Sequence, residues 1–267
     1  MRRGANAFPC ILLIVAASFA NPAPASCAPR AGPAPLDAAV VGFKAQVKEW
    51  IDESLGQAEL MREFLAAGDL AGAERAWLAA RGGWERAEVV TDEFFPDLDA
   101  AIDAWPNGKA GFHVIEAKLF GAHRMDALPE TDALIANMSE FQRVFSQKTL
   151  TAQGVLNGIA KLAFEVGENK ANGGESPFSG NSIAEMGDNI AGIDAAYRAI
   201  FANAVGTGDA RLDGTIGCAI GRLQKLLSTA DVKTLDQDEL REDAEDLVVS
   251  FGDMAAVIGL AEPRLGN

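Results

Sequence analysis

A histidine and a glutamate lie three residues apart in the stretch from Gly111 to Gly121, GFHVIEAKLFG. Residues three apart share one face of an α-helix, so the His113 imidazole and the Glu116 carboxylate are expected to point the same way. The residues around them are largely apolar and would bury that helix. An imidazole and a carboxylate held together in an apolar setting indicate the beginning of a metal site. The chain contains only two histidines, so it offers few nitrogen ligands.

Several acidic residues could supply oxygen ligands to the same ion. One pair is again three residues apart on an expected helix, three aspartates lie in the connection before the histidine helix, and one glutamate lies in a glycine-rich loop. These candidates are Glu85, Glu88, Asp97, Asp99, Asp103 and Glu175. Taken singly, each also fits a solvated acid or a helix cap, and His113 alone fits a buried core histidine.

The combination of these residues favours a metal site. Helical bundles build such sites from Glu and His side chains that face inward from neighbouring helices. One imidazole with several carboxylates suits iron or manganese, and it suits zinc less well. The second histidine, His123, falls at an expected helix end and is interpreted as a capping charge rather than a ligand.

The N-terminus is typical of an exported protein. Arg2 and Arg3 precede an apolar run over residues 8–20, followed by small residues and prolines. We therefore expect a signal peptide over residues 1–25, a Pro/Ala-rich tether over 26–35 and one helical domain over 36–267. Cleavage after Ala20 or Ala25 would give a soluble periplasmic protein. The alternative is a lipid on Cys27, which would be the chain's only link to a membrane.

Charge and motifs exclude several other classes of function. The formal net charge of −15 argues against nucleic acid or anionic lipid as a partner, and it is compatible with cation handling. The sequence contains no HExxH, no GxSxG and no P-loop. A disulfide between Cys27 and Cys218 is compatible with an oxidising compartment, but the sequence does not establish it.

Apolar residues recur with helical spacing along the whole domain, and no alternating strand pattern is found. The sequence predicts an all-α protein of seven to eight helices, arranged as two packed four-helix-bundle halves. Two irregular connections are expected, over residues 95–108 and 168–180. The expected helices cover approximately residues 40–65, 70–94, 111–121, 129–145, 151–166, 182–205, 210–229 and 237–260.

Two motifs carry a resemblance to a known family. The stretch Gly111-Phe112-His113-Val114-Ile115-Glu116 resembles the GxHxxE signature of the imelysin family. The stretch from Trp84 to Asp103 is similar to the Tyr-Glu-Arg-Ile-Glu … Asp-Leu-Asp-x-x-Ile-Asp segment of its Efe-type branch, which includes a periplasmic component of bacterial iron uptake. Gly174-Glu175-Ser176 is a weaker match to a Gly-Glu-Glu stretch of that branch.

The resemblance implies a fold, a site and a function. The fold would be two four-helix bundles around a metal site. The function would be to bind Fe(II) or Fe(III) and present it to an inner-membrane iron permease, alongside a peroxidase-like periplasmic partner. Glu85 and Glu116 would be the first choice as direct ligands beside His113, and Glu88 and Asp103 would ligate or orient. The implied metal site consists of Glu85, Glu88, Asp103, His113, Glu116 and Glu175.

The sequence also departs from the pattern of the Efe-type branch. Trp84 replaces the usual Tyr, a downstream histidine of the branch is absent near Gly180, and no segment resembles the cupredoxin domain of longer relatives. A second metal position and a copper-assisted redox step are therefore in doubt. Two other functions stay open at this point: a zinc-dependent peptidase of imelysin type, and a metal-free surface adaptor.

Overall fold

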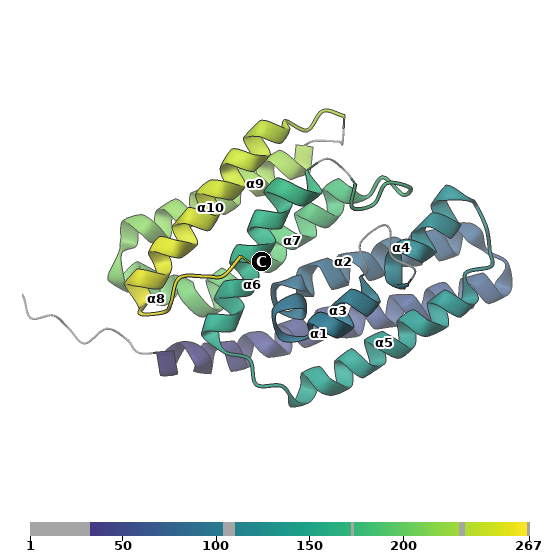
Figure 1. Cartoon of the computed structure of the whole chain (residues 1–267), viewed down its shortest axis with the longest axis horizontal. Helices are drawn as coiled ribbons and strands as arrows, with labels where there is room; N and C mark the ends of the chain where they lie inside the picture. The colour runs from purple at the N-terminus through teal and green to yellow at the C-terminus, as the bar shows by residue number, and fades with distance from the viewer. Residues whose placement is uncertain (1–32, 104–109, 172–173, 230–232, 266–267) are drawn as a thin grey trace, which may run out of the picture. The chain divides into compact units, whose positions relative to one another are not determined.

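The computed structural model describes residues 33–103, 110–171, 174–229 and 233–265 (Figure 1). The expected signal peptide and Cys27 lie outside these ranges. Within them the chain forms α-helices and short π-helical segments and no strand, so the all-α prediction is confirmed. No helix in the described ranges is long and apolar enough to cross a membrane.

The first half of the described chain begins with two long helices. Its elements are α1 (Pro33–Ala67), α2 (Leu70–Phe94), α3 (Pro96–Ile102), α4 (Gly111–Glu116), the π-helix η1 (Ala117–Gly121) and α5 (Leu128–Gln147). Helix α1 packs against both α2 and α5, and the short helices α3 and α4 pack against α2 and α5. This set forms the first helical bundle.

The second half forms another bundle. Its elements are α6 (Ala152–Glu165), η2 (Val166–Lys170), α7 (Ser182–Ala196), η3 (Tyr197–Phe201), α8 (Ala202–Gly208), α9 (Ala210–Thr229) and α10 (Gln237–Ile258). Helices α6, α7, α9 and α10 pack against one another and lie side by side in Figure 1. Helix α2 of the first bundle also packs against α6 and α7, so it joins the two halves.

Two glycines let α2 approach the second bundle closely. A Cβ atom on Gly158 of α6 would lie 2.1 Å from the backbone oxygen of Val89, and one on Gly192 of α7 would lie 2.4 Å from that of Arg86. Any larger residue would push the helices apart. The contacts lie on the segment of α2 that carries Glu85 and Glu88, so these carboxylates face the second bundle.

Local signals explain where several helices begin. The Asp69 carboxylate accepts a hydrogen bond from Gly72 N at 2.8 Å, and the Thr151 hydroxyl accepts one from Gly154 N at 3.1 Å. Both side chains act as N-caps, because they satisfy free N–H groups of a first turn.

The boundaries differ from the prediction in several places. Residues 96–102 form helix α3 where an irregular connection was expected, because Pro96 is favourable at the first helical position and the acids that follow suit a helix N-terminus. Helix α1 begins at Pro33, three residues before the expected start of the domain. The helix expected over 182–205 is interrupted by the π-helical segment η3.

Candidate metal centre

The position of His113 depends on the glycine at the start of α4. Gly111 has a φ of +72°, and a Cβ atom there would lie 2.1 Å from the backbone oxygen of Ile102. Only glycine tolerates both the backbone conformation and this contact. The start of α4 therefore rests against the end of α3. His113 is brought beside Asp103, which follows α3 directly.

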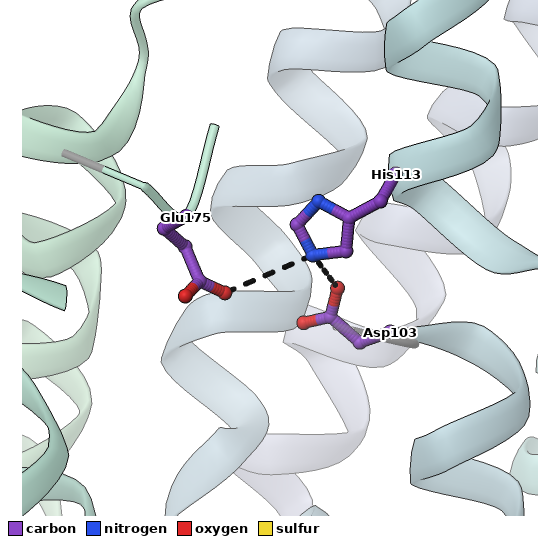
Figure 2. Close-up of side chains that lie close together, drawn as sticks. All are labelled: Asp103, His113 and Glu175. Atoms are coloured by element: carbon purple, nitrogen blue, oxygen red, sulfur yellow. Dashed lines mark ion pairs between the residues drawn. The ribbon is translucent and has the colours of Figure 1, made fainter. Parts of the chain in front are cut away.

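His113, Asp103 and Glu175 form one compact group (Figure 2). The Nε2 atom of His113 lies 3.1 Å from Asp103 Oδ1 and 3.8 Å from Glu175 Oε1. The three side chains offer ligand atoms that all lie within 4.8 Å of one another. His113 is 2% exposed and Glu175 is 3% exposed, so the group is shielded from bulk water.

A second group contains Glu85, Glu88 and Asp103, whose ligand atoms again lie within 4.8 Å of one another. Glu85 and Glu88 project from the same face of α2, as their spacing predicted. Asp103 belongs to both groups and so links them. The structure thus brings together five of the six expected site residues. The sixth is Glu116, and Asp97, a further acidic candidate, is exposed.

Glu116 lies behind His113 and contacts a loop. Its Oε2 atom is 3.8 Å from His113 Nδ1, the ring nitrogen that does not face Asp103. Its Oε1 atom accepts hydrogen bonds from Phe178 N at 3.1 Å, Ser179 N at 2.8 Å and Ser179 Oγ at 2.9 Å. Glu116 belongs to neither of the two groups described above.

Two buried cations also lie at this centre, and neither was expected from the sequence. Arg81 on α2 is 0% exposed and forms ion pairs with Glu85 and Asp103. Its Nε atom is also 3.2 Å from Glu185 Oε1 on α7, and its Nη2 atom is 3.6 Å from Glu175 Oε1. Arg81 lies four residues before Glu85 on an otherwise apolar helix face, and this spacing is the signal that could have identified it.

Lys170 is the second cation, and it comes from the π-helix η2. Its Nζ atom donates hydrogen bonds to Glu88 Oε2 at 2.9 Å and Glu85 Oε2 at 3.1 Å. It also lies 3.7 Å from Glu175 Oε1. The Asn189 side chain donates to the same Glu85 and Glu88 oxygens, at 2.8 and 2.9 Å. Nothing in the local sequence around Lys170 predicts this placement.

Burial and nearby charges shift the pKa values of the buried side chains in different directions. Burial alone would lower the pKa of His113, but the nearby carboxylates of Asp103 and Glu116 outweigh it and raise that pKa to about 9. Burial raises the pKa of Glu175 to about 7 and that of Glu88 well above its usual value. Burial would also raise the pKa of Asp103, but the Arg81 guanidinium overcomes it and holds that pKa well below its usual range.

A pocket of about 190 Å³ borders the centre. It is lined by Glu88, Asp103, Lys170 and Glu175 of the centre and by further acidic residues from α2, α3 and α6. These acids include Asp92, Asp99 and Glu165. Burial raises the pKa of Asp99 to about 7, so the inner pocket wall gains negative charge as pH rises through neutrality. The pocket gives small cations an acidic approach to Glu88, Asp103 and Glu175.

We expect the metal-free protein to lose stability as pH rises from 6.5 to 9. The folded state retains the His113 proton through this range, whereas the unfolded chain releases it near pH 6.5. The stabilising effect is complete below pH 6.5 and is lost as pH passes the raised pKa. One pKa unit corresponds to about 1.4 kcal/mol, so His113 alone can contribute about 3 kcal/mol. Urea unfolding in a chelator, followed by circular dichroism, measures the change.

The control for this prediction is the His113→Ala variant, which should show a flatter pH profile over the same range. Glu175 acts in the same direction at lower pH, because its raised pKa lets the folded state hold a proton between about pH 4.5 and 7 that the unfolded chain has lost. Equal free energies of unfolding at pH 6.5 and 9 in the unmodified protein would contradict the prediction.

The fold and the HxxE-bearing site define a family. The sequence profile of the imelysin family matches residues 36–256, so the chain belongs to the imelysin family. Among curated proteins it is similar to the iron uptake system component EfeM of Pseudomonas syringae pv. syringae (strain B728a), at 30% identity over 174 residues, which cover 61% of each chain. It is also similar to the iron uptake system component EfeO of Escherichia coli O157:H7, at 28% identity over 167 residues.

The matches to these relatives are partial. The EfeO match covers 59% of this chain and 44% of the relative, so the chain spans less than two thirds of the length of either relative. Among solved structures, a putative iron-regulated protein A precursor from Parabacteroides distasonis superposes with a TM-score of 0.71. That match covers 87% of this chain and 97% of the other at 17% identity, and it therefore supports the fold alone.

Proposed function

We propose that this chain is a metal-binding component of bacterial iron uptake that binds Fe(II) or Fe(III) at the centre described above. The observation that carries the proposal is the pair of ligand groups that share Asp103, each with its atoms within 4.8 Å. The printed names of EfeM and EfeO support iron as the ion. Manganese and zinc are the other ions to be tested.

The charge balance of the centre supports a bound cation. Six buried or nearly buried carboxylates meet there, against the cations Arg81 and Lys170 and, near neutral pH, the protonated His113. The carboxylates are Glu85, Glu88, Asp103, Glu116, Glu175 and Glu185. Uncompensated buried charge is costly, so the centre must take up protons or a metal ion. The raised pKa values of Glu88 and Glu175 are the response expected when no metal ion is present.

The donor set fits iron chemically. His113 would supply a nitrogen through Nε2, the atom that faces Asp103 and Glu175. Glu85, Glu88, Asp103 and Glu175 would supply hard oxygen donors, which suit iron and manganese better than they suit metals that prefer thiolate. Both ring nitrogens of His113 and Oε2 of Glu175 are buried without a hydrogen-bond partner in the described part of the chain. Oε2 of Glu175 is available to an ion, whereas Nε2 of His113 must first lose the proton that its raised pKa retains near neutral pH.

Lys170 would compete with the incoming ion. Its ammonium group lies between Glu85 and Glu88, where a metal ion would share the same oxygens. A metal ion must therefore displace this charge or bind on the opposite side, nearer Asp103 and His113. Such competition weakens binding relative to an uncontested site. Weaker binding suits a carrier that has to release its ion.

The cellular role that we propose draws on the names of the iron-uptake relatives, on the resemblance to the Efe-type branch and on the N-terminus. The chain would act in the periplasm and present iron to an inner-membrane iron permease, with a peroxidase-like protein in the same system. A signal peptide over residues 1–25 would direct export, and a lipid on Cys27 would link the chain to the membrane. No observation on the centre specifically favours a zinc peptidase over this role.

Metal uptake by the unmodified protein tests the proposal. We expect protein purified from the periplasm to contain iron. The metal-free protein should bind Fe(II) under anaerobic conditions with about one ion per chain, measured by calorimetry and by metal analysis after gel filtration. Parallel titrations with Mn(II) and Zn(II) rank the ions. The Asp243→Asn variant is a control, because Asp243 pairs with Arg222 away from the centre.

Two results would count against the proposal. A protein that takes up none of the three ions would leave the metal-free adaptor as the better account. Chelator-sensitive cleavage of an unfolded polypeptide by the zinc-loaded protein would support the peptidase instead. Uptake of iron without such cleavage is the result that we expect.

A further inference from the structure

One ligand of the proposed centre is carried by a loop rather than by a helix. Glu175 belongs to the segment 174–181, called here the Glu175 loop, which precedes α7. The other proposed ligands lie on α2, on α4 or directly after α3. The place of Glu175 in the centre therefore depends on what holds its loop.

Two buried carboxylates hold the Glu175 loop. Glu185 of α7 accepts hydrogen bonds from Ser176 Oγ at 2.7 Å and from Asn181 Nδ2 at 3.1 Å. Glu116 of α4 accepts three hydrogen bonds from the other side of the loop, two from the backbone N–H groups of Phe178 and Ser179 and one from the Ser179 hydroxyl. Glu185 thus holds the loop to the second bundle, and Glu116 holds it to the first.

All three of these bonds end on the same atom, Oε1 of Glu116. Hydrogen bonds from backbone N–H groups to a buried carboxylate are charge-assisted and stronger than neutral ones. An oxygen that accepts three such bonds has little capacity left for a metal ion. The other oxygen faces Nδ1 of His113, on the side of the ring away from Asp103 and Glu175.

We propose that Glu116 is a positioning residue rather than a metal ligand: it anchors the Glu175 loop and thereby holds Glu175 at the centre. This inference rests on the proposed function for its effect on metal binding, whereas the anchoring itself does not require a metal. The glutamate of the HxxE motif then acts on the ion through Glu175.

Hydrogen exchange of the metal-free protein tests the anchor directly. In a chelator, Glu116→Ala should raise the exchange rate of the 174–181 amides at least about tenfold, because three loop bonds are lost. Glu116→Gln should restore most of the protection, since its amide oxygen can accept the same bonds. Glu130→Ala is a control, because Glu130 pairs with Lys118 and does not touch the loop. Unchanged exchange in Glu116→Ala would overturn the proposal.

A double-mutant cycle tests the route to the ion. Glu175→Ala removes a proposed ligand and should weaken Fe(II) binding, and Glu116→Ala should weaken it by about 10- to 100-fold, as for loss of an orienting group. If Glu116 acts through Glu175, the double variant should bind within about threefold of Glu175→Ala alone. If the loss of Fe(II) affinity in the double variant equalled the product of the two single losses, Glu116 would contact the ion independently, and the proposal would be overturned.

The hydrogen-exchange and iron-binding experiments separate the anchoring role of Glu116 from the proposed function. If the unmodified protein bound no iron, the proposed function would fail, and the exchange experiment would still decide whether Glu116 anchors the loop. If the protein bound iron and exchange in Glu116→Ala stayed slow, only the anchoring role would fail. Circular dichroism of each variant checks that the helices remain folded.

Discussion

Replacing His113 with alanine is expected to lower Fe(II) affinity by at least about 100-fold while leaving the helical content unchanged. His113 is the histidine that contacts the proposed ligands, and its Nε2 atom faces both Asp103 and Glu175. A small side chain there removes the nitrogen donor without adding a charge. Anaerobic calorimetry measures the affinity, and circular dichroism measures the helical content.

The chain offers a matched control for this prediction. His123 is the other histidine, and its side chain is 73% exposed after η1. Its φ of 50° lies in the left-handed region, which asparagine tolerates better than alanine does, so His123→Asn is the suitable replacement. This variant should bind Fe(II) as the parent does. Equal affinity in the parent and in His113→Ala would show that the ion binds elsewhere.

The spacing of residues along single helices could be predicted from the sequence. The i, i+3 pairs Glu85/Glu88 and His113/Glu116 lie on their helices as expected, because helical period alone decides which side chains share a face. Asp103 was a candidate because it closely precedes the histidine helix. The structure shows the reason for its contact with His113, which is the close approach at Gly111.

Contacts between distant segments could not be predicted in the same way. The Glu116 carboxylate accepts bonds from a loop more than 60 residues further along the chain, and Lys170 reaches Glu85 from 85 residues away. Such contacts depend on how the two bundles pack, which no local pattern encodes. Arg81 is different, because a charged residue on the apolar face of α2 was visible in the sequence and called for a buried partner.

The buried arginine leads to the second large effect. Replacing Arg81 with methionine should lower the free energy of unfolding of the metal-free protein by about 3–5 kcal/mol at pH 7.5. Arg81 is 0% exposed and pairs with Glu85, Asp103 and Glu185, while its guanidinium lies 5.2 Å from the centre of the Phe112 ring. Methionine fills part of the space, but it leaves buried carboxylates without their counter-charge.

Controls separate the loss of charge from the loss of an ion pair in general. Arg62→Met removes a pair with Asp132 in which both side chains are about half exposed, and such pairs contribute at most about 1 kcal/mol. Arg81→Lys keeps one positive charge but lacks the fork that reaches several carboxylates, so its stability should lie between those of the parent and Arg81→Met. Urea unfolding in a chelator gives all three values.

Metal should offset the loss in Arg81→Met if the carboxylates around Arg81 form the ion site. Removing a fixed cation increases the net negative charge near Asp103, which strengthens the attraction for Fe(II). A ligand that binds only the folded state stabilises it in proportion to its affinity, so saturating Fe(II) should raise the stability of Arg81→Met more than that of the parent. A variant that is destabilised equally with and without Fe(II) would separate the Arg81 network from the ion site.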